Sequence, residues 1–353
     1  MRPERDDFRL PPIEPAGWLN GPGPDVAALA GKVVLVDFWD YTCIHCIRTL
    51  PHMTEWARRY REAGLVVIGV HAPEFPFAAE RQNVEAAVRS LGLRHPVALD
   101  GERAVWRAFR NRYLPARYLA GRDGLVRWFH FGEGAHVETE EALRAALAAP
   151  EGAPLPEPSL AMMPLTASGA VAVALEGAAG ELCVPVTREL YLNTAHGRFG
   201  NGPVDFGDTG VEIFRDDGDH EPDRAYLGGR WQLDERAVEH RGVAEATIAV
   251  RYTAAEVNLV LTPPPTGPCR VLLEDAGGPL AVERRGPDVF SADGMAAVDV
   301  RAPRMYALVQ DDHVGEGTLR IRLPAACEGL RAFAFTFMSR TWQGPRPFAG
   351  GAR

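Results

Sequence analysis

The feature that most constrains the fold is an unbroken apolar run near the start of the chain, GKVVLVDFW at residues 31–39. Its residues are mostly β-branched or aromatic, and they follow one another instead of alternating with polar residues. A strand of this kind is covered on both faces, which happens when helices pack on both sides of a sheet. The run therefore predicts an α/β domain with residues 31–39 as a central strand.

The segments that follow alternate between helix and strand patterns. We expect helices at 44–62, 78–91, 104–110 and 138–149, and further strands at 65–70, 116–119 and 126–131. Gly64 is a stop signal for the first helix, and Asp123-Gly124 is a hairpin turn signal between the last two strands. This order predicts a mixed sheet in a domain at 1–148, with an N-terminal extension at 1–24.

The sequence pattern changes after residue 148. Five of the fifteen residues from Pro150 to Pro164 are proline, which predicts a semi-extended linker at 149–165. Short alternating apolar stretches follow, for example Phe333, Phe335 and Phe337, separated by clusters of Gly, Pro and Asp. We therefore expect an all-β second domain, an antiparallel β-sandwich at 166–345, and a C-terminal tail at 346–353.

Charge and hydropathy exclude several classes of protein. The net charge is −9, which disfavours a general nucleic-acid binder, because such a protein needs a basic face. No run of 18 apolar residues exists, so we expect no membrane-spanning helix. The first fifteen residues lack the apolar core of a secretory signal. We therefore expect a cytoplasmic protein, whereas an upstream segment missing from this sequence would place it outside the cytoplasm.

Two of the five cysteines, Cys43 and Cys46, form a C-x-x-C motif where the first helix begins. The amides of a first helical turn have no partner within the helix, and the positive end of the helix dipole lies there. A thiolate at Cys43 is therefore stabilised, and a protonated His45 would favour it further. Cys46 lies one turn later, within reach of a mixed disulfide formed at Cys43. The motif predicts a redox pair in which Cys43 attacks and Cys46 resolves.

A metal site and an inert disulfide are the competing interpretations of this motif. A zinc site would need another ligand beside Cys43, His45 and Cys46. An inert structural disulfide is poorly placed at a solvent-facing helix start. The sequence therefore favours redox chemistry by the disulfide, without a metal or another cofactor. The three remaining cysteines stand in apolar, strand-like segments and are expected to be buried thiols: Cys183, Cys269 and Cys327.

The segment VDFWDYTCIHCIRTLP resembles the active-site segment of the thioredoxin family. The resemblance implies that Asp37 lies buried behind the disulfide and transfers protons to and from Cys46, and that Pro51 kinks the helix. Burial of a carboxyl group inside an apolar strand is costly and raises its pKa, which suits proton transfer near neutrality. The segment NRYLPARYL matches the place of the family's cis-proline, so we expect a cis bond at Pro115. The backbone of Leu114 would then be free to pair with a substrate strand.

More narrowly, the chain is similar to the soluble part of the DipZ-type thiol–disulfide proteins, a branch of the TlpA-like thioredoxins. The similarity continues through RWFHFGEG at 127–134 and into the second half, for example AFAFTF at 332–337. It implies that the second domain is a jelly roll resembling carbohydrate-binding modules. The membrane-embedded electron-transfer portion of the family has no counterpart in this sequence, so the electron donor is unidentified.

Further side chains are expected to surround the redox pair or to bind sugar. Asp40 is expected at the rim of a substrate groove, which is lined by Trp39, Tyr41, Thr42, Ile44, His45 and Leu114. Aromatic residues of the second domain could stack on the apolar face of a sugar ring. The candidates for such a carbohydrate contact are Tyr191, Trp231, Tyr252 and Trp342.

These features together predict a thiol–disulfide oxidoreductase that exchanges the Cys43–Cys46 pair with the thiols or disulfides of protein substrates. One alternative is a thiol peroxidase, but such an enzyme uses a Thr/Ser-x-x-Cys arrangement with a nearby arginine, and Thr42 beside Cys43 does not supply it. The other is a glycan-binding or assembly protein whose thioredoxin-like part is a redox-sensitive scaffold. Cysteine-dependent turnover separates the oxidoreductase from the scaffold.

Overall fold

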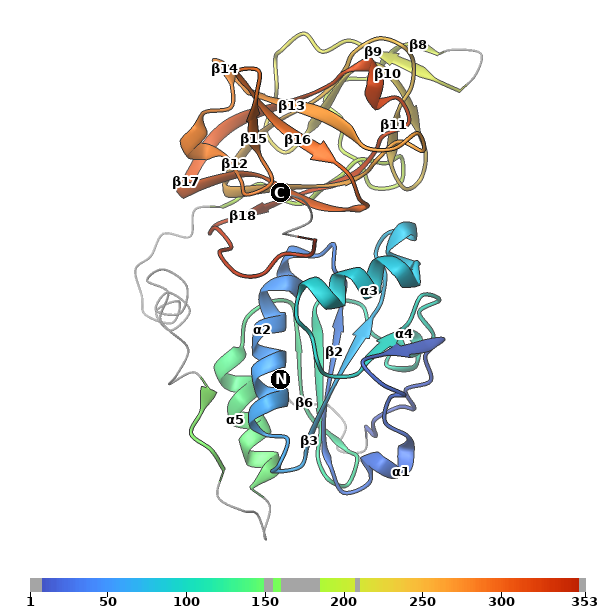
Figure 1. Cartoon of the computed structure of the whole chain (residues 1–353), viewed down its shortest axis with the longest axis vertical. Coiled ribbons are helices and arrows are strands. Elements are labelled where there is room, and N and C mark those ends of the chain that lie inside the picture. The colour runs from blue at the N-terminus through green and yellow to red at the C-terminus, as the bar shows by residue number, and fades with distance from the viewer. Residues whose placement is uncertain (1–7, 149–154, 160–184, 207–209, 349–353) are drawn as a thin grey trace. The chain divides into compact units, whose positions relative to one another are not determined.

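The computed structural model describes residues 8–148, 155–159, 185–206 and 210–348, and the chain divides into two compact units (Figure 1). Unit 1 comprises Met1–Ala179 and Gly344–Arg353, and unit 2 comprises Gly180–Gln343. Most of the predicted linker at 149–165 lies outside the described residues, as does Cys183. The predicted boundaries between the domains therefore stay predictions.

Unit 1 is built on a six-stranded mixed sheet in the order β1-β4-β3-β2-β5-β6. β2, β3 and β4 are parallel, and the other pairings are antiparallel. The strands are β1 (Gly17–Leu19), β2 (Val33–Trp39), β3 (Leu65–His71), β4 (Val97–Leu99), β5 (Ala116–Ala120) and β6 (Val126–Phe131). The helices are α1 (Val26–Leu29), α2 (Ile44–Arg59), the 3-10 helix η1 (Pro76–Ala79), α3 (Arg81–Ser90), α4 (Ala104–Ala108) and α5 (His136–Leu147). The predicted α/β domain with a mixed sheet is confirmed.

The central strand β2 is buried at every position, because both faces of the sheet are covered. Its side chains alternate between the faces. Val33 and Leu35 pack with residues of α2 and α5, which run along one face of the sheet in Figure 1. Val34 and Val36 pack on the other face with Val105 of α4. The sequence of β2 does not alternate between apolar and polar residues because both of its faces are buried, as predicted.

Both ends of the chain contribute to unit 1. β1 pairs with β4, and the Leu10 amide donates to the Gly124 carbonyl at 2.9 Å, so the described part of the N-terminal extension packs on the sheet. At the other end, the Phe348 amide donates to Ser90 Oγ at 2.9 Å. The Phe348 ring also contacts the ring of Tyr41, with centroids 5.8 Å apart. The described part of the expected C-terminal tail is therefore attached to unit 1.

Unit 2 is a strand-rich antiparallel structure, in agreement with the expected all-β domain. Its sheet follows the order β15-β16-β13-β17-β12-β18-β11-β10-β9-β8, with β14 beside β13 and β7 beside β18. The strands are β7 (Leu190–Tyr191), β8 (Pro203–Phe206), β9 (Glu212–Phe214), β10 (Ala225–Leu233), β11 (Val238–His240), β12 (Ala246–Thr262), β13 (Cys269–Asp275), β14 (Gly278–Pro279), β15 (Phe290–Ala292), β16 (Met295–Val300), β17 (Arg304–Leu323) and β18 (Arg331–Met338). Two 3-10 helices, η3 (Val282–Arg284) and η4 (Ala325–Cys327), lie between strands.

The sheet of unit 2 is barrel-like. The long strands β12 and β17 pair along most of their length, and β12 also pairs with β18 and with β10. Because β18 pairs with β11 and β11 pairs with β10, the four strands β12, β18, β11 and β10 close a ring. The apolar core of unit 2 includes Trp231, Leu259 and Phe335. The finer assignment of a jelly roll resembling carbohydrate-binding modules stays a prediction.

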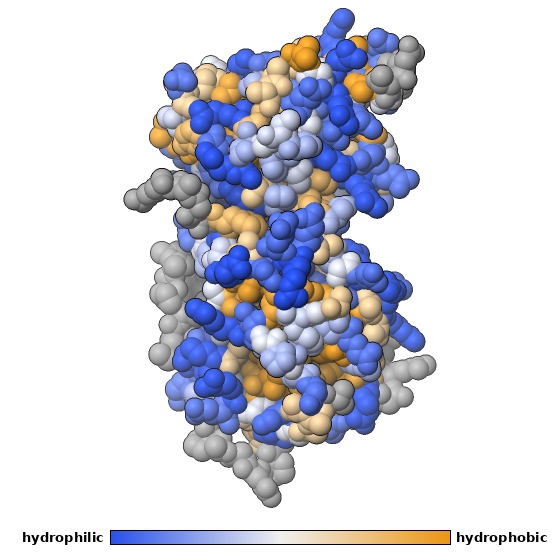
Figure 2. All heavy atoms as spheres, turned by 45° about the vertical axis from the view of Figure 1, so that its right-hand side comes forward, coloured by the Kyte–Doolittle hydropathy of each residue, from blue (hydrophilic) through white to orange (hydrophobic). Residues whose placement is uncertain are grey.

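The surface shows no broad apolar area on the side drawn in Figure 2, where hydrophilic residues dominate and apolar ones occur in small groups. In the ranges that the structure describes, every helix is too short or too polar to cross a lipid bilayer.

Candidate active site

Cys43 and Cys46 form a disulfide at the start of α2, with their α-carbons 5.2 Å apart. This separation lies within the range of ordinary disulfides. Cys43 is the N-cap residue of the helix, and its sulfur accepts a hydrogen bond from the Cys46 amide at 3.2 Å. The Cys43 side chain keeps 8% of its surface exposed, whereas Cys46 has none. The two sulfurs are therefore unequal: an incoming group meets Cys43 first, and the helix N-terminus favours negative charge there.

The loop before Cys43 is held by the carboxylate of Asp40, which is fully buried. It accepts hydrogen bonds from the Thr42 hydroxyl at 2.9 Å and from the amides of Thr42 and Glu74 at 3.2 and 2.7 Å. His71 Nε2 lies 3.2 Å from the same carboxylate. Burial alone would raise the pKa of Asp40, but His71 and the two amides hold it below its ordinary value. Asp40 was expected at the rim of a groove; it instead fixes the loop that carries Cys43.

Asp37 lies on β2 as an isolated buried carboxyl group. It has no exposed surface, and among the described residues neither of its oxygens has a hydrogen-bond partner. Burial raises the pKa of Asp37 from 3.8 to about 7, and the nearby positive charge of Arg117 opposes that rise. A carboxyl group with this pKa can both accept and release a proton at neutral pH. The predicted burial and raised pKa of Asp37 are confirmed.

Arg117 is a neighbour of this site that the sequence analysis missed. It lies directly opposite Asp37 on the adjacent strand β5 and is also fully buried. Its guanidinium donates to the Thr139 hydroxyl at 3.1 Å and to the Gly134 carbonyl, both at the start of α5. Burial lowers the pKa of Arg117 to about 10. The sequence did contain a signal for it: an arginine stands in the apolar strand ARYLA, two residues after the expected cis-proline. A charge is rarely buried in such a strand without a partner.

On the opposite, more exposed side of the motif, His45 belongs to a small ionic cluster. Its Nδ1 lies 2.8 Å from Glu133 Oε2, and Arg48 Nε donates to Glu133 Oε1 at 2.6 Å. Burial would raise the pKa of Glu133, but His45 and Arg48 hold it below its ordinary value. The Glu133 carboxylate therefore fixes the imidazole that stands between the two cysteines. Glu133 was not singled out from the sequence, because nothing in its Gly-Glu-Gly context marks it.

The Leu114–Pro115 bond is cis, as expected from the resemblance. The Pro115 carbonyl accepts the Gly132 amide at 2.8 Å, which joins this segment to the end of β6. Leu114 precedes β5, and within the described ranges no hydrogen bond engages its backbone amide or carbonyl. Those two groups are free for an extended chain to pair with them.

The predicted substrate groove needs correction. Four of its expected lining residues have at most 2% of their surface exposed: Trp39, Tyr41, Thr42 and Ile44. The prediction that their side chains line a groove is wrong for this structure. Tyr41 packs between His71 and Phe348, so its ring belongs to the core under the motif. Of the six, His45 is exposed and Leu114 is half-buried.

The predicted sugar platform in unit 2 is wrong for two of its four aromatic residues. Trp231 is fully buried and donates through Nε1 to the Gly228 carbonyl at 2.9 Å. Tyr252 is 2% exposed, and its hydroxyl accepts a hydrogen bond from Arg284 at 2.8 Å. Tyr191 and Trp342 are half-buried.

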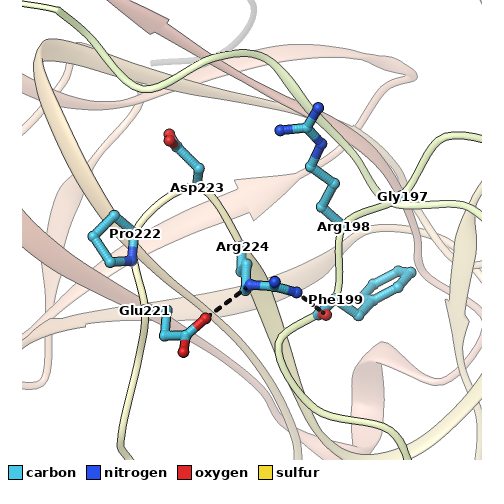
Figure 3. Close-up of a pocket in the computed structure, with 7 residues that line it drawn as sticks. All are labelled: Gly197, Arg198, Phe199, Glu221, Pro222, Asp223 and Arg224. Carbon is cyan, nitrogen blue, oxygen red and sulfur yellow. Dashed lines mark hydrogen bonds and ion pairs between the residues drawn. The ribbon is translucent and has the colours of Figure 1, made fainter.

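A surface pocket of about 680 Å³ lies elsewhere in unit 2, between the loops around Arg198 and Asp223 (Figure 3). Arg224 pairs with Glu221 of its own loop at 2.9 Å, and it joins the two loops by donating to the Phe199 carbonyl at 3.2 Å. The pocket is polar and charged, and none of the four predicted aromatic residues lines it.

In the described part of the chain, no group of three or more His, Cys, Asp or Glu side chains could hold a metal ion.

Comparison with known proteins covers both units. The AhpC/TSA family matches residues 18–129, and the thioredoxin-like C-terminal domain matches residues 187–337. Protein DipZ of Mycobacterium bovis is 35% identical over 331 residues, which cover 91% of this chain and 41% of DipZ. Thiol-disulfide oxidoreductase ResA of Bacillus thuringiensis is 31% identical over 129 residues, which cover 36% of this chain and 69% of ResA. This chain belongs to the thioredoxin-like thiol–disulfide oxidoreductase family.

Within this thioredoxin-like family, the similarity to DipZ extends through both units, while the similarity to ResA is limited to about a third of the chain. The chain spans about two-fifths of the length of DipZ. Among solved structures, a thioredoxin-like protein in its oxidised form is 27% identical, with a TM-score of 0.38, and covers 41% of this chain and 97% of its own. The similarity to DipZ and to ResA confirms the resemblance to DipZ-type and TlpA-like proteins.

Proposed function

We propose that this chain exchanges the Cys43–Cys46 dithiol and disulfide with thiols and disulfides of protein substrates. The observation that carries the proposal is the inequality of the two sulfurs: Cys43 caps α2 and is partly exposed, and Cys46 is enclosed one turn behind it. A more accessible attacking thiol and an enclosed resolving thiol are what a two-step exchange requires.

In the reducing direction, the Cys43 thiolate attacks a sulfur of the substrate disulfide. A Cys43–substrate bond forms, and the substrate's own disulfide breaks to release one thiol. Cys46 then loses its proton and attacks Cys43, which forms the Cys43–Cys46 bond seen here and releases the second substrate thiol. We assign the proton of Cys46 to Asp37, because this carboxyl is buried, has no hydrogen-bond partner and has a pKa of about 7. No further cofactor is needed for these steps.

The substrate is proposed to bind as an extended segment beside the cis-Pro115 turn. The free backbone groups of Leu114 would supply main-chain hydrogen bonds, which tolerate many substrate sequences. His45, which is exposed and held by Glu133, would face the bound segment. Protein thiols and disulfides are therefore the expected substrates, and the electron donor is a second protein or small dithiol of unknown identity.

The direction of electron flow follows from the reduction potential of the Cys43–Cys46 couple. A value near about −270 mV indicates a reductant, and one nearer about −120 mV indicates an oxidant. The cytoplasmic location expected from the sequence agrees with the first outcome, and the extracytoplasmic alternative agrees with either. The location and a carbohydrate ligand for unit 2 both stay predictions, and an oligosaccharide array tests the second.

Insulin reduction with dithiothreitol as the electron donor tests the proposal. We expect the wild-type chain to accelerate it, Cys43→Ser to abolish the acceleration, and Cys46→Ser to accumulate a covalent adduct between Cys43 and the substrate. Cys269→Ala, which removes a buried thiol of unit 2, serves as the matched control and should keep the wild-type rate. An acceleration that survives in Cys43→Ser would show that this pair does not carry the exchange.

A further inference from the structure

Unit 2 contains a second pair of cysteines that the proposed exchange does not use. Cys269 is the first residue of β13, and Cys327 is the last residue of η4. They are 58 positions apart in the sequence, yet η4 packs on β13 and both side chains belong to the same core cluster. Both are free thiols in this structure.

The two cysteines lie in neighbouring elements of the same core. The Cys327 thiol donates to the carbonyl of Arg270, the residue after Cys269, at 3.3 Å, which fixes its sulfur beside the start of β13. The Cys327 thiol is also the main cause of the raised pKa of Cys269, as expected for neighbouring side chains. A single buried cysteine packs as a small apolar residue. Two thiols that adjacent elements bring together in one core are instead candidates for a covalent bond.

The backbone around Cys327 is already held in place without such a bond. The Cys327 amide donates to the Pro324 carbonyl at 2.8 Å, and the Leu330 amide donates to the Cys327 carbonyl at 3.0 Å. The helix η4 is therefore positioned in the dithiol form. Because these backbone hydrogen bonds do not involve the thiols, we expect η4 to keep its place in both redox forms.

We propose that Cys269 and Cys327 form a second dithiol–disulfide couple, which a low-molecular-weight disulfide such as oxidised glutathione converts to an intramolecular bond between β13 and η4. Cys269 is the entry point, because it retains 8% of its surface exposed and Cys327 retains none. This couple lies in a different unit from the Cys43–Cys46 pair and does not depend on its activity.

The reaction takes two exchange steps. Cys269 loses its proton and attacks one sulfur of the reagent; a Cys269–glutathione bond forms, the reagent disulfide breaks, and the leaving thiolate takes up a proton. Cys327 then loses its proton and attacks the Cys269 sulfur, which forms the Cys269–Cys327 bond and releases a second glutathione thiol. Two protein thiols are oxidised and one reagent disulfide is reduced. Burial and the neighbouring Cys327 thiol raise the pKa of Cys269, so the first step is slow compared with exchange at Cys43.

Formation of this bond should stabilise unit 2. It closes a loop of 58 positions that contains β14 to β17, and a cross-link over a loop of this length restricts the unfolded chain strongly. For a unit of this size, the expected rise in the melting temperature is about 10 °C.

The test is peptide mapping of the native, fully reduced wild-type chain after incubation with oxidised glutathione and alkylation of the remaining thiols. We expect a linked pair of peptides that contain Cys269 and Cys327, without retained glutathione. The Cys43–Cys46 bond, which forms in the same sample, shows that the reagent was active. Alkylation of both Cys269 and Cys327 in that sample, or glutathione retained on Cys269, would overturn the proposal.

A variant separates the two steps. Cys327→Ser removes the resolving thiol, so we expect glutathione to remain bound at Cys269, and Cys327→Ala provides the same readout if serine disturbs the fold. An unmodified Cys269 in a folded variant overturns its assignment as the entry point. The Cys43→Ser chain should form the Cys269–Cys327 bond as the wild type does, so failure of the proposed exchange activity and failure of this inference are distinguishable.

Discussion

Replacement of the Asp37 carboxyl group should stabilise unit 1 in a way that depends on pH. The group has an ordinary pKa of 3.8 and a folded-state pKa of about 7, because burial disfavours its charged form. Below pH 3.8 the carboxyl is protonated in both states and its ionisation affects neither. As the pH rises from 3.8 to 7, the unfolded chain releases the proton more readily, so the folded state loses stability. Above pH 7 the folded state has lost about 4 kcal/mol of stability, since each unit of difference between the folded and unfolded pKa is worth about 1.4 kcal/mol.

Asp37→Asn keeps the shape of the side chain and removes this ionisation. The buried amide has its own desolvation cost, but that cost is the same at every pH, so the difference between two pH values isolates the carboxyl. Removal of the ionisation should raise the free energy of unfolding by about 1 kcal/mol at pH 4.5 and by about 4 kcal/mol at pH 8.5. The variant should therefore gain about 3 kcal/mol relative to the wild type between these two pH values.

Urea unfolding of the oxidised chain at pH 4.5 and 8.5 provides the measurement, with tryptophan fluorescence of unit 1 as the signal. Glu102→Gln is the matched control, because this carboxylate is exposed and its removal should change stability equally at both pH values. If Asp37→Asn changes the free energy of unfolding by the same amount at pH 4.5 and 8.5, Asp37 does not titrate between them. The assignment of Asp37 as the proton carrier for Cys46 would then fail with it.

Three further changes test the surroundings of the two units. Arg117→Gln removes the positive charge that lowers the pKa of Asp37, so the pH midpoint of insulin reduction should move upward, whereas Arg117→Lys should preserve it. Glu133→Gln breaks the contacts to His45 and Arg48, and chemical unfolding should show a loss of about 1–2 kcal/mol. Trp231→Ala should destabilise unit 2 by about 3–5 kcal/mol in calorimetry, because this side chain is fully buried, and a sugar-binding role would instead leave stability near that of the wild type.

The sequence predicted the parts of unit 1 that depend on local physics. An apolar run at 31–39 and a helix opened by Cys43 are visible in the order of residues, because burial on both faces and helix capping each act over a few positions. The strands β1 and β4 were not predicted. Each has three residues, which is too short for a periodic pattern, and each is stabilised by pairing with the other across a long separation in the sequence.

The side chains of the site were harder to predict than its backbone. Tyr41 beside the motif was expected to be exposed, but its environment depends on Phe348, which is more than 300 positions away. Trp231 is an aromatic residue in an alternating strand, and alternation does not reveal which face of a barrel-like sheet is the interior. Arg117 carried a signal, a charge in a buried strand, but its partners at Gly134 and Thr139 become visible only in three dimensions.

One short segment contacts both His45 and Arg117. Glu133, which holds His45, and Gly134, which accepts a hydrogen bond from Arg117, are consecutive residues between β6 and α5. Arg117 is thereby held by the start of α5 instead of forming an ion pair with Asp37, whose oxygens have no hydrogen-bond partner. An ion pair between the two would keep the Asp37 carboxyl charged at neutral pH and unable to take a proton and release it there. The short connection after β6 thus holds both His45 and Arg117, and it leaves the pKa of Asp37 in the range where proton transfer at neutral pH is possible.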